Sequence, residues 1–229
     1  METTQKSQVA AQRKPKFERV QNPPPILLTE RDLDVLFALL RYRFLSSDQI
    51  AALIRDGSAV QLKRRLQSLF HAGYVDRPAA QKKYYSKEGQ LPFVYALARA
   101  GARALMEHER YANLRLDWAH KNKSVTDPTI KHTLAIADAM IGFETQSGEE
   151  FLSQASLLDV GEDRKQLKWK AVIPGKDGPE KLGVIPDQFF GLKGADGKTR
   201  FFFVEADRGK MPVTRTGPRQ TSLIQKVQS

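Results

Sequence analysis

Between residues 29 and 73, apolar side chains recur at helical spacing in three short stretches that are separated by tight turns. Thr29, Ser46 and Ser58 each stand where a side-chain oxygen can cap the helix that follows. Gly73 ends the third stretch as a natural helix stop. The sequence therefore predicts helices at about residues 30–41, 46–54 and 58–72, an arrangement typical of a helix-turn-helix.

The predicted third helix has a core stripe and an opposite polar face. The stripe consists of Leu62, Leu66, Leu69 and Phe70, and the polar face of Gln61, Arg64, Gln67, Ser68 and His71. Lys63 and Arg65 lie on the two flanks between them. In a helix-turn-helix this helix enters the major groove of DNA. We therefore expect base contacts from Gln61, Arg64 and Ser68, and phosphate contacts from Lys63 and Arg65. The alternative is an ordinary exposed helix face.

The segment after this helix alternates as a β-hairpin does. Residues 81–86 and 92–97 are the predicted strands, residues 87–90 the turn, and a helix restarts near Gly101. Three helices, a hairpin and a helix give the order of a winged helix. The hairpin adds three candidate DNA contacts, Lys82, Lys83 and Lys87.

Net charge indicates a polyanionic partner. The chain has 37 basic and 26 acidic residues, a formal charge of +11. Residues 55–87 hold eight basic residues against two acidic ones, so more than half of the net charge lies in these 33 residues, which span the predicted third helix and the first strand of the hairpin. This placement predicts double-stranded DNA as the partner. A weaker interpretation is that this basic surface contacts RNA or an acidic protein.

Several classes of protein are excluded or disfavoured. The chain has no cysteine, which excludes disulfides, thiol nucleophiles and cysteine metal sites. No apolar run approaches the roughly 18 residues of a membrane span, and residues 1–19 contain no apolar leader segment. We expect a cytoplasmic protein with no membrane partner.

Composition changes predict the domain organisation of an α+β protein. Residues 1–25 are expected to form a flexible basic tail, 26–110 the winged helix, 111–128 a linker and 129–229 a smaller α/β domain. In the last part, an apolar helix follows Pro128, and strands are predicted at 151–158, 168–173, 184–192 and 200–206. His132 on that helix is expected to be buried and hydrogen-bonded.

Acidic residues gather at two of these strands, which an Asp-Gly turn predicts to be antiparallel neighbours. With the period of a strand, Glu205 and Asp207 share one face with Phe201 and Phe203, which we expect to be buried. Buried carboxylates need a positive partner, and Asp187, Glu205 and Asp207 would suit Mg²⁺ or Mn²⁺. The alternative is ion pairing and strand-end capping.

The spacing of Asp187 and Glu205, eighteen residues apart, resembles the PD-(D/E)XK nuclease core. That resemblance implies catalysis by Asp187 and Glu205 with a lysine close by. The pattern has lysine where this chain has Asp207, so Lys210 or Arg208 would have to replace it.

A broader similarity covers most of the chain. The predicted winged helix, residues 130–134, 185–187, 202–209 and 211–213 are similar to the plasmid replication-relaxation family. The resemblance implies a protein of plasmids or integrated mobile elements that acts on DNA through an N-terminal winged helix. It implies as further partners a second copy of the chain and other replication or mobilisation proteins. It also implies a helix after residues 220–222, so a chain that ends at Ser229 is expected to lack part of the cover of its second domain.

Two hypotheses follow. The first is a double-stranded DNA-binding protein, with no enzymatic activity, that acts in replication control, relaxation or transcriptional regulation. The second is a nuclease dependent on a divalent metal, which the winged helix delivers to DNA; Asp187 and Glu205 would hold the metal and Lys210 would lie near the scissile phosphate.

Overall fold

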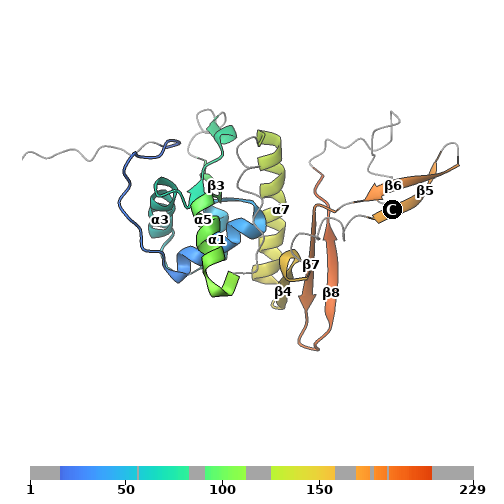
Figure 1. Ribbon diagram of the computed structural model, residues 1–229. Helices are drawn as coiled ribbons and strands as arrows, with labels where there is room; N and C mark the ends of the chain where they lie inside the picture. The colour runs from blue at the N-terminus through green and yellow to red at the C-terminus, as the bar shows by residue number, and fades with distance from the viewer. Residues whose placement is uncertain are drawn as a thin grey trace, which may run out of the picture.

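The computed structural model describes residues 16–55, 57–82, 91–111, 125–157, 169–175, 178–184 and 186–207. Helices and antiparallel sheets both occur, so the fold class is α+β, as predicted. In Figure 1 the long helix α7 (Asp127–Gln146) lies between an N-terminal group of helices and a sheet formed by the later strands.

The N-terminal half contains the predicted helices with a small sheet among them. Its elements are α1 (Glu30–Tyr42), β1 (Phe44–Ser46), α2 (Ser47–Leu53), α3 (Ala59–His71), β2 (Val75–Asp76), β3 (Val94–Leu97) and α5 (Arg99–Glu107), with 3₁₀ turns at Ala79–Gln81 and Glu109–Tyr111. Strand β3 lies in the middle of the sheet and pairs antiparallel with both β1 and β2. The predicted caps are confirmed, since the side chains of Thr29, Ser46 and Ser58 each accept a hydrogen bond from the backbone of the following helix.

The first strand of the predicted hairpin, residues 81–86, is described only at Gln81 and Lys82, and neither residue is in a strand. The partners of β3 are β1 and β2, and Gln81, predicted as strand, lies in a 3₁₀ turn. The side-chain amide of the buried Gln81 replaces a strand neighbour, because it donates to the carbonyl of Val94 and accepts from the Val94 N–H, both at 2.9 Å. Residues 83–86 lie outside the described residues.

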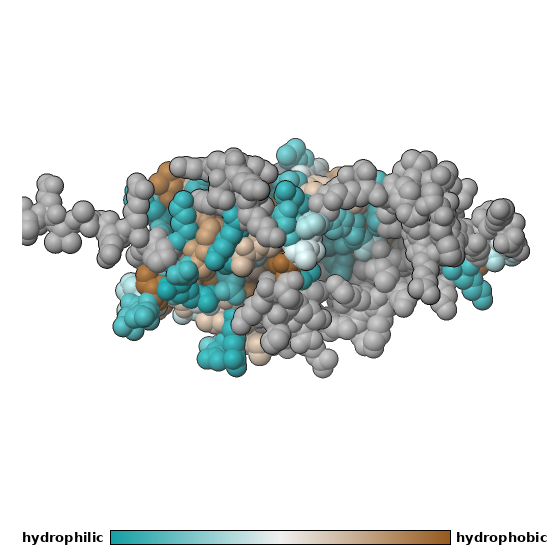
Figure 2. Space-filling model, turned by 90° about the horizontal axis from the view of Figure 1, so that it is seen from above, coloured by the Kyte–Doolittle hydropathy of each residue, from teal (hydrophilic) through white to brown (hydrophobic). Residues whose placement is uncertain are grey.

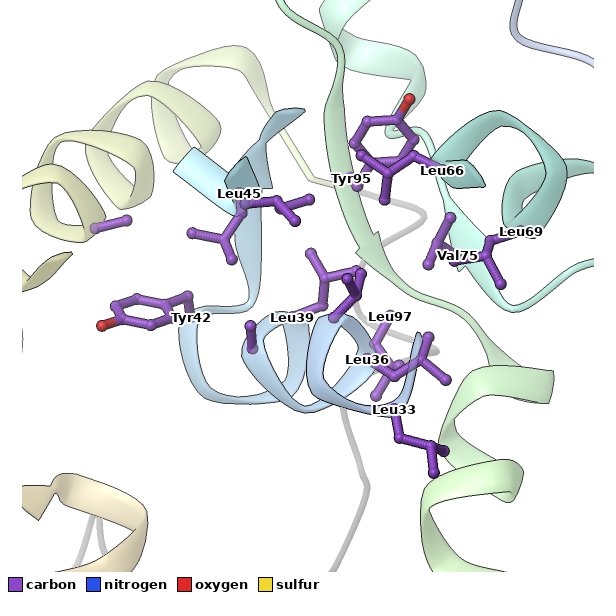
Figure 3. Close-up of a cluster of buried hydrophobic side chains, with 14 of the residues drawn as sticks. Leu33, Leu36, Leu39, Tyr42, Leu45, Leu66, Leu69, Val75, Tyr95 and Leu97 are labelled. Atoms are coloured by element: carbon purple, nitrogen blue, oxygen red, sulfur yellow. The ribbon is translucent and has the colours of Figure 1, made fainter. Parts of the chain in front are cut away.

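A core of branched aliphatic side chains joins these elements. Figure 3 shows Leu36 and Leu39 of α1 with Leu66 and Leu69 of α3, together with residues of the sheet. All four leucines are buried. The stripe predicted for the third helix is therefore confirmed as a core-facing surface.

The later elements form a second sheet and a separate hairpin. The sheet has the order β4 (Glu150–Ser153), β7 (Gln188–Lys193), β8 (Thr199–Val204), and the hairpin consists of β5 (Trp169–Gly175) and β6 (Gly178–Val184). As predicted, β7 and β8 are antiparallel neighbours; Gly197, in the turn between them, has a φ of +76°. The prediction of strand as far as residue 158 is wrong, because α8 (Gln154–Leu157) follows β4.

Helix α7 connects the two halves. The same buried cluster contains Leu39 and Leu45 from the N-terminal half, Met140 from α7 and Phe190 from β7. The Gln49 side chain of α2 donates to the Leu134 carbonyl of α7 at 2.9 Å. The helix that the sequence places in the second domain therefore packs directly against the first.

Candidate nucleic-acid interface and carboxylate cluster

Helix α3 buries its predicted stripe and exposes two of its candidate base contacts. Leu62, Leu66 and Leu69 are buried, whereas Gln61 and Arg64 are exposed. Among the described residues, neither of these two side chains has a hydrogen-bond or ion-pair partner, so both are available to a ligand. Ser68 is half-buried, and its hydroxyl donates to the carbonyl of Arg64 at 3.3 Å.

His71 differs from its prediction. The sequence places it on the polar face of this helix, but the residue is buried. Its Nδ1 accepts a hydrogen bond from the Val20 N–H at 3.3 Å, so a segment before α1 covers this end of the helix.

Lys63 forms an ion pair on the surface. Its Nζ lies 2.9 Å from a carboxylate oxygen of Asp48 on α2, and more than half of each side chain is exposed. Exposed pairs of this kind contribute about 1 kcal/mol at most. A phosphate group can therefore compete with Asp48 for Lys63.

Arg65 is held inside the protein surface instead of pointing outward. Its Nε and Nη2 donate to the two carboxylate oxygens of Asp32 at 2.9 and 2.6 Å, and Nη2 also donates to the Leu27 carbonyl at 2.7 Å. Burial acts to raise the pKa of Asp32, but hydrogen bonds from Arg65 and Thr29 outweigh it and hold that pKa below the usual value. The hydrogen bond to Asp32 raises the pKa of Arg65. The structure thus gives Arg65 a role in fixing α3 to the start of α1, and its phosphate contact stays a prediction.

Of the three hairpin lysines, the structure describes one. Lys82 is exposed, and its Nζ lies 5.6 Å from the centre of the Phe17 ring. Lys83 and Lys87 lie outside the described residues. Figure 2 shows hydrophilic residues prominent on the described surface of the N-terminal half.

Asp187, just before β7, belongs to the predicted carboxylate cluster of Asp187, Glu205 and Asp207, and its own carboxylate has two partners. One carboxylate oxygen accepts the Ala206 N–H at 2.9 Å, and the other lies 3.1 Å from Nε2 of His132 on α7. His132 is half-buried, which only partly matches the expectation of a buried, hydrogen-bonded histidine. Asp187 therefore ties the chain after β8 to the start of β7 and to α7.

Glu205 and Asp207 lie on an exposed face. Phe201 and Phe203, which share that face, are 56% and 57% exposed, so the expectation of a buried strand face is wrong. Within the described ranges, no group of three histidine or acidic residues is placed to hold a metal ion. Lys210 lies outside them.

Two acidic partners of the basic side chains of α3 were not found from the sequence. Asp48 is the partner of Lys63, and Asp32 is the partner of Arg65, 33 positions away. The capping pattern at Thr29 indicates a role for Asp32 within α1, but a pairing between distant helices leaves no signal in a single sequence.

In the described part of the chain, no helix is long and apolar enough to cross a membrane. A family model described as Replication-relaxation matches residues 36–227. Neither the curated proteins nor the solved structures gave a match.

Proposed function

The chain belongs to the replication-relaxation family, and on that basis we propose that it binds double-stranded DNA of a plasmid or integrated mobile element. Its task there is replication control, relaxation or transcriptional regulation. DNA is bound through a winged helix in the N-terminal half, with α3 in the major groove.

The order of the elements supports the winged-helix assignment. Helices α1, α2 and α3 are followed by β2 and β3, and β1 between α1 and α2 completes a sheet of order β1-β3-β2. In this arrangement we assign α3 as the recognition helix and the connection between β2 and β3 as the wing; the structure describes residues 77–82 and 91–93 of this connection. Lys82 lies on that connection.

The observation that carries the proposal is the outward face of α3. Arg64 and Gln61 are exposed on the side opposite the buried leucines, and arginine and glutamine are the side chains that pair with guanine and adenine edges. Lys63, next to them, forms a weak surface ion pair with Asp48, and a phosphate group can take the place of Asp48.

In the second half, the contacts of Asp187 favour strand-end capping over metal binding. Both of its carboxylate oxygens are engaged, by the Ala206 N–H and by His132. We therefore assign this half, which we take to resemble a PD-(D/E)XK core, a role in assembly without DNA cleavage.

A gel with supercoiled plasmid and Mn²⁺ tests this choice. Wild type and Asp187→Ala are compared for retardation of the plasmid and for its conversion to nicked circles. We expect retardation by both proteins and nicking by neither. Nicking by the wild type that disappears in Asp187→Ala would establish the nuclease instead, and a plasmid that neither protein retards would contradict DNA binding.

A further inference from the structure

Helix α3 has an apolar side chain in its first turn that faces solvent. Val60 is 60% exposed, although it lies in the same helix as the buried Leu62 and Leu66. It belongs to neither of the two buried clusters that the described residues form. The packing of the fold therefore does not account for a valine at this position.

Val60 lies on the face of α3 that we propose to meet DNA. Arg64 follows it by four residues, so the two side chains lie on consecutive turns of one helix face. Gln61, three residues before Arg64, is exposed beside them. Figure 1 shows α3 on the side of the N-terminal half that is turned away from α7. An exposed apolar group therefore lies directly among the candidate base contacts.

The first turn of α3 holds Val60 in place. The hydroxyl of Ser58 caps the helix and accepts a hydrogen bond from the Val60 N–H at 3.3 Å. A β-branched side chain in a helix is largely restricted to one χ1 rotamer. The two methyl groups of Val60 are therefore held in one direction before a ligand binds, and little side-chain entropy is lost on binding.

The chemistry of the major groove indicates what this side chain can contact. Among the groups that base pairs present there, the C5-methyl group of thymine is the apolar one. Residues near the N-terminus of a recognition helix are the ones that reach base edges. Another protein is a poorer fit, because apolar docking patches cover roughly several hundred Å² and Val60 is a single valine beside an arginine and a glutamine.

We propose that Val60 contacts the C5-methyl group of a thymine in the duplex bound by α3. This inference rests on the proposed DNA binding and adds a specificity-determining residue to it. Four residues of helix rise by about 6 Å and successive base pairs by about 3.4 Å. The thymine therefore lies within about three base pairs of the pair that Arg64 contacts.

The test exchanges thymine for uracil, which removes the C5-methyl group alone. Duplexes are selected from a random library with the wild type, and each thymine of the selected duplex is then replaced singly by uracil. Fluorescence anisotropy gives the dissociation constant of every duplex for the wild type, Val60→Ala and Val172→Ala. Val172 is a matched control, since it is 63% exposed and lies on β5 in the other half of the chain.

The wild type and Val172→Ala should bind about fourfold more weakly when the contacted thymine is replaced by uracil, as expected for the loss of one buried methyl group. Val60→Ala should bind the thymine and uracil duplexes with a difference of less than about twofold. This variant should stay folded, because alanine is a better helix former than valine at an exposed position.

Two results would overturn the contact. One is a wild type that no uracil replacement weakens, or a loss that is equal in the wild type and Val60→Ala. The other is a sensitive thymine more than about three base pairs from the pair at which Arg64→Ala loses its discrimination. In both cases, a wild-type preference for the selected duplex over a scrambled one would leave the proposed DNA binding intact. A wild type that selects no duplex would instead contradict the proposed function itself.

Discussion

Arg64 and Arg65 are neighbours in the sequence, but their surroundings separate their roles. Arg64 is exposed on the outward face of α3, whereas Arg65 binds both carboxylate oxygens of Asp32. Arg65→Gln should lower the free energy of unfolding by about 1–3 kcal/mol, because it leaves the buried Asp32 short of hydrogen bonds. It should leave the salt dependence of DNA binding unchanged. Denaturant unfolding and anisotropy titration check the two parts; a lowered salt slope with unchanged stability would return Arg65 to the phosphate contacts.

The same pair predicts a dependence on pH. The pKa of Asp32 is lowered in the folded protein, so the pair stabilises the fold above the ordinary aspartate pKa of about 4 and loses this effect as pH falls through the lowered value. The difference in unfolding free energy between wild type and Arg65→Gln should therefore shrink from pH 6 to pH 3. A constant difference over this range would contradict the assignment of the charged pair.

At the scale of secondary-structure elements, Gly101 is the position where α5 lies in close contact with its neighbours. A Cβ on Gly101 would lie 2.2 Å from the Tyr74 carbonyl oxygen and 2.9 Å from a methyl group of Leu36. The backbone oxygen cannot rotate away, so Gly101→Ala should cost about 3 kcal/mol or more. Gly142 on α7 has no such neighbours among the described residues, and Gly142→Ala should stabilise the protein by up to about 1 kcal/mol. Thermal unfolding of both variants checks this; equal effects would show that α5 does not pack as described.

The helices were predictable because their signals are local. Caps at Thr29, Ser46 and Ser58 and the leucine stripe of α3 lie within a few residues of the elements that they define. The three-residue β1 and the two-residue β2 are too short for a periodic pattern, and their pairing with β3 depends on contacts between distant residues. The local pattern of α3 also predicted correctly that Gln61 and Arg64 are exposed. The burial of His71 and the pairing of Arg65 with Asp32 were missed, because both depend on contacts between distant residues.

Across the whole molecule, α7 makes the two halves one packed structure. Met140 is buried in the cluster that also contains Leu39 and Phe190. Met140→Ala should lower the free energy of unfolding by about 2–5 kcal/mol and shift a single transition seen equally by far-UV and near-UV circular dichroism. Two separate transitions, with only one shifted by the substitution, would mean that the halves unfold independently.

The central claim, that α3 reads duplex DNA, is tested most directly by sequence preference. Duplexes are selected from a random library with the wild type, and the affinity for the selected duplex and a scrambled one is measured for wild type, Arg64→Ala, Lys82→Ala and the exposed control Arg103→Ala. Arg64→Ala should lose about 1–3 kcal/mol on the selected duplex and most of the preference, whereas Lys82→Ala should weaken both duplexes alike and lower the salt slope by about 1. Arg103→Ala should retain the preference. A wild type that selects no duplex, or a preference that survives intact in Arg64→Ala, would contradict the claim.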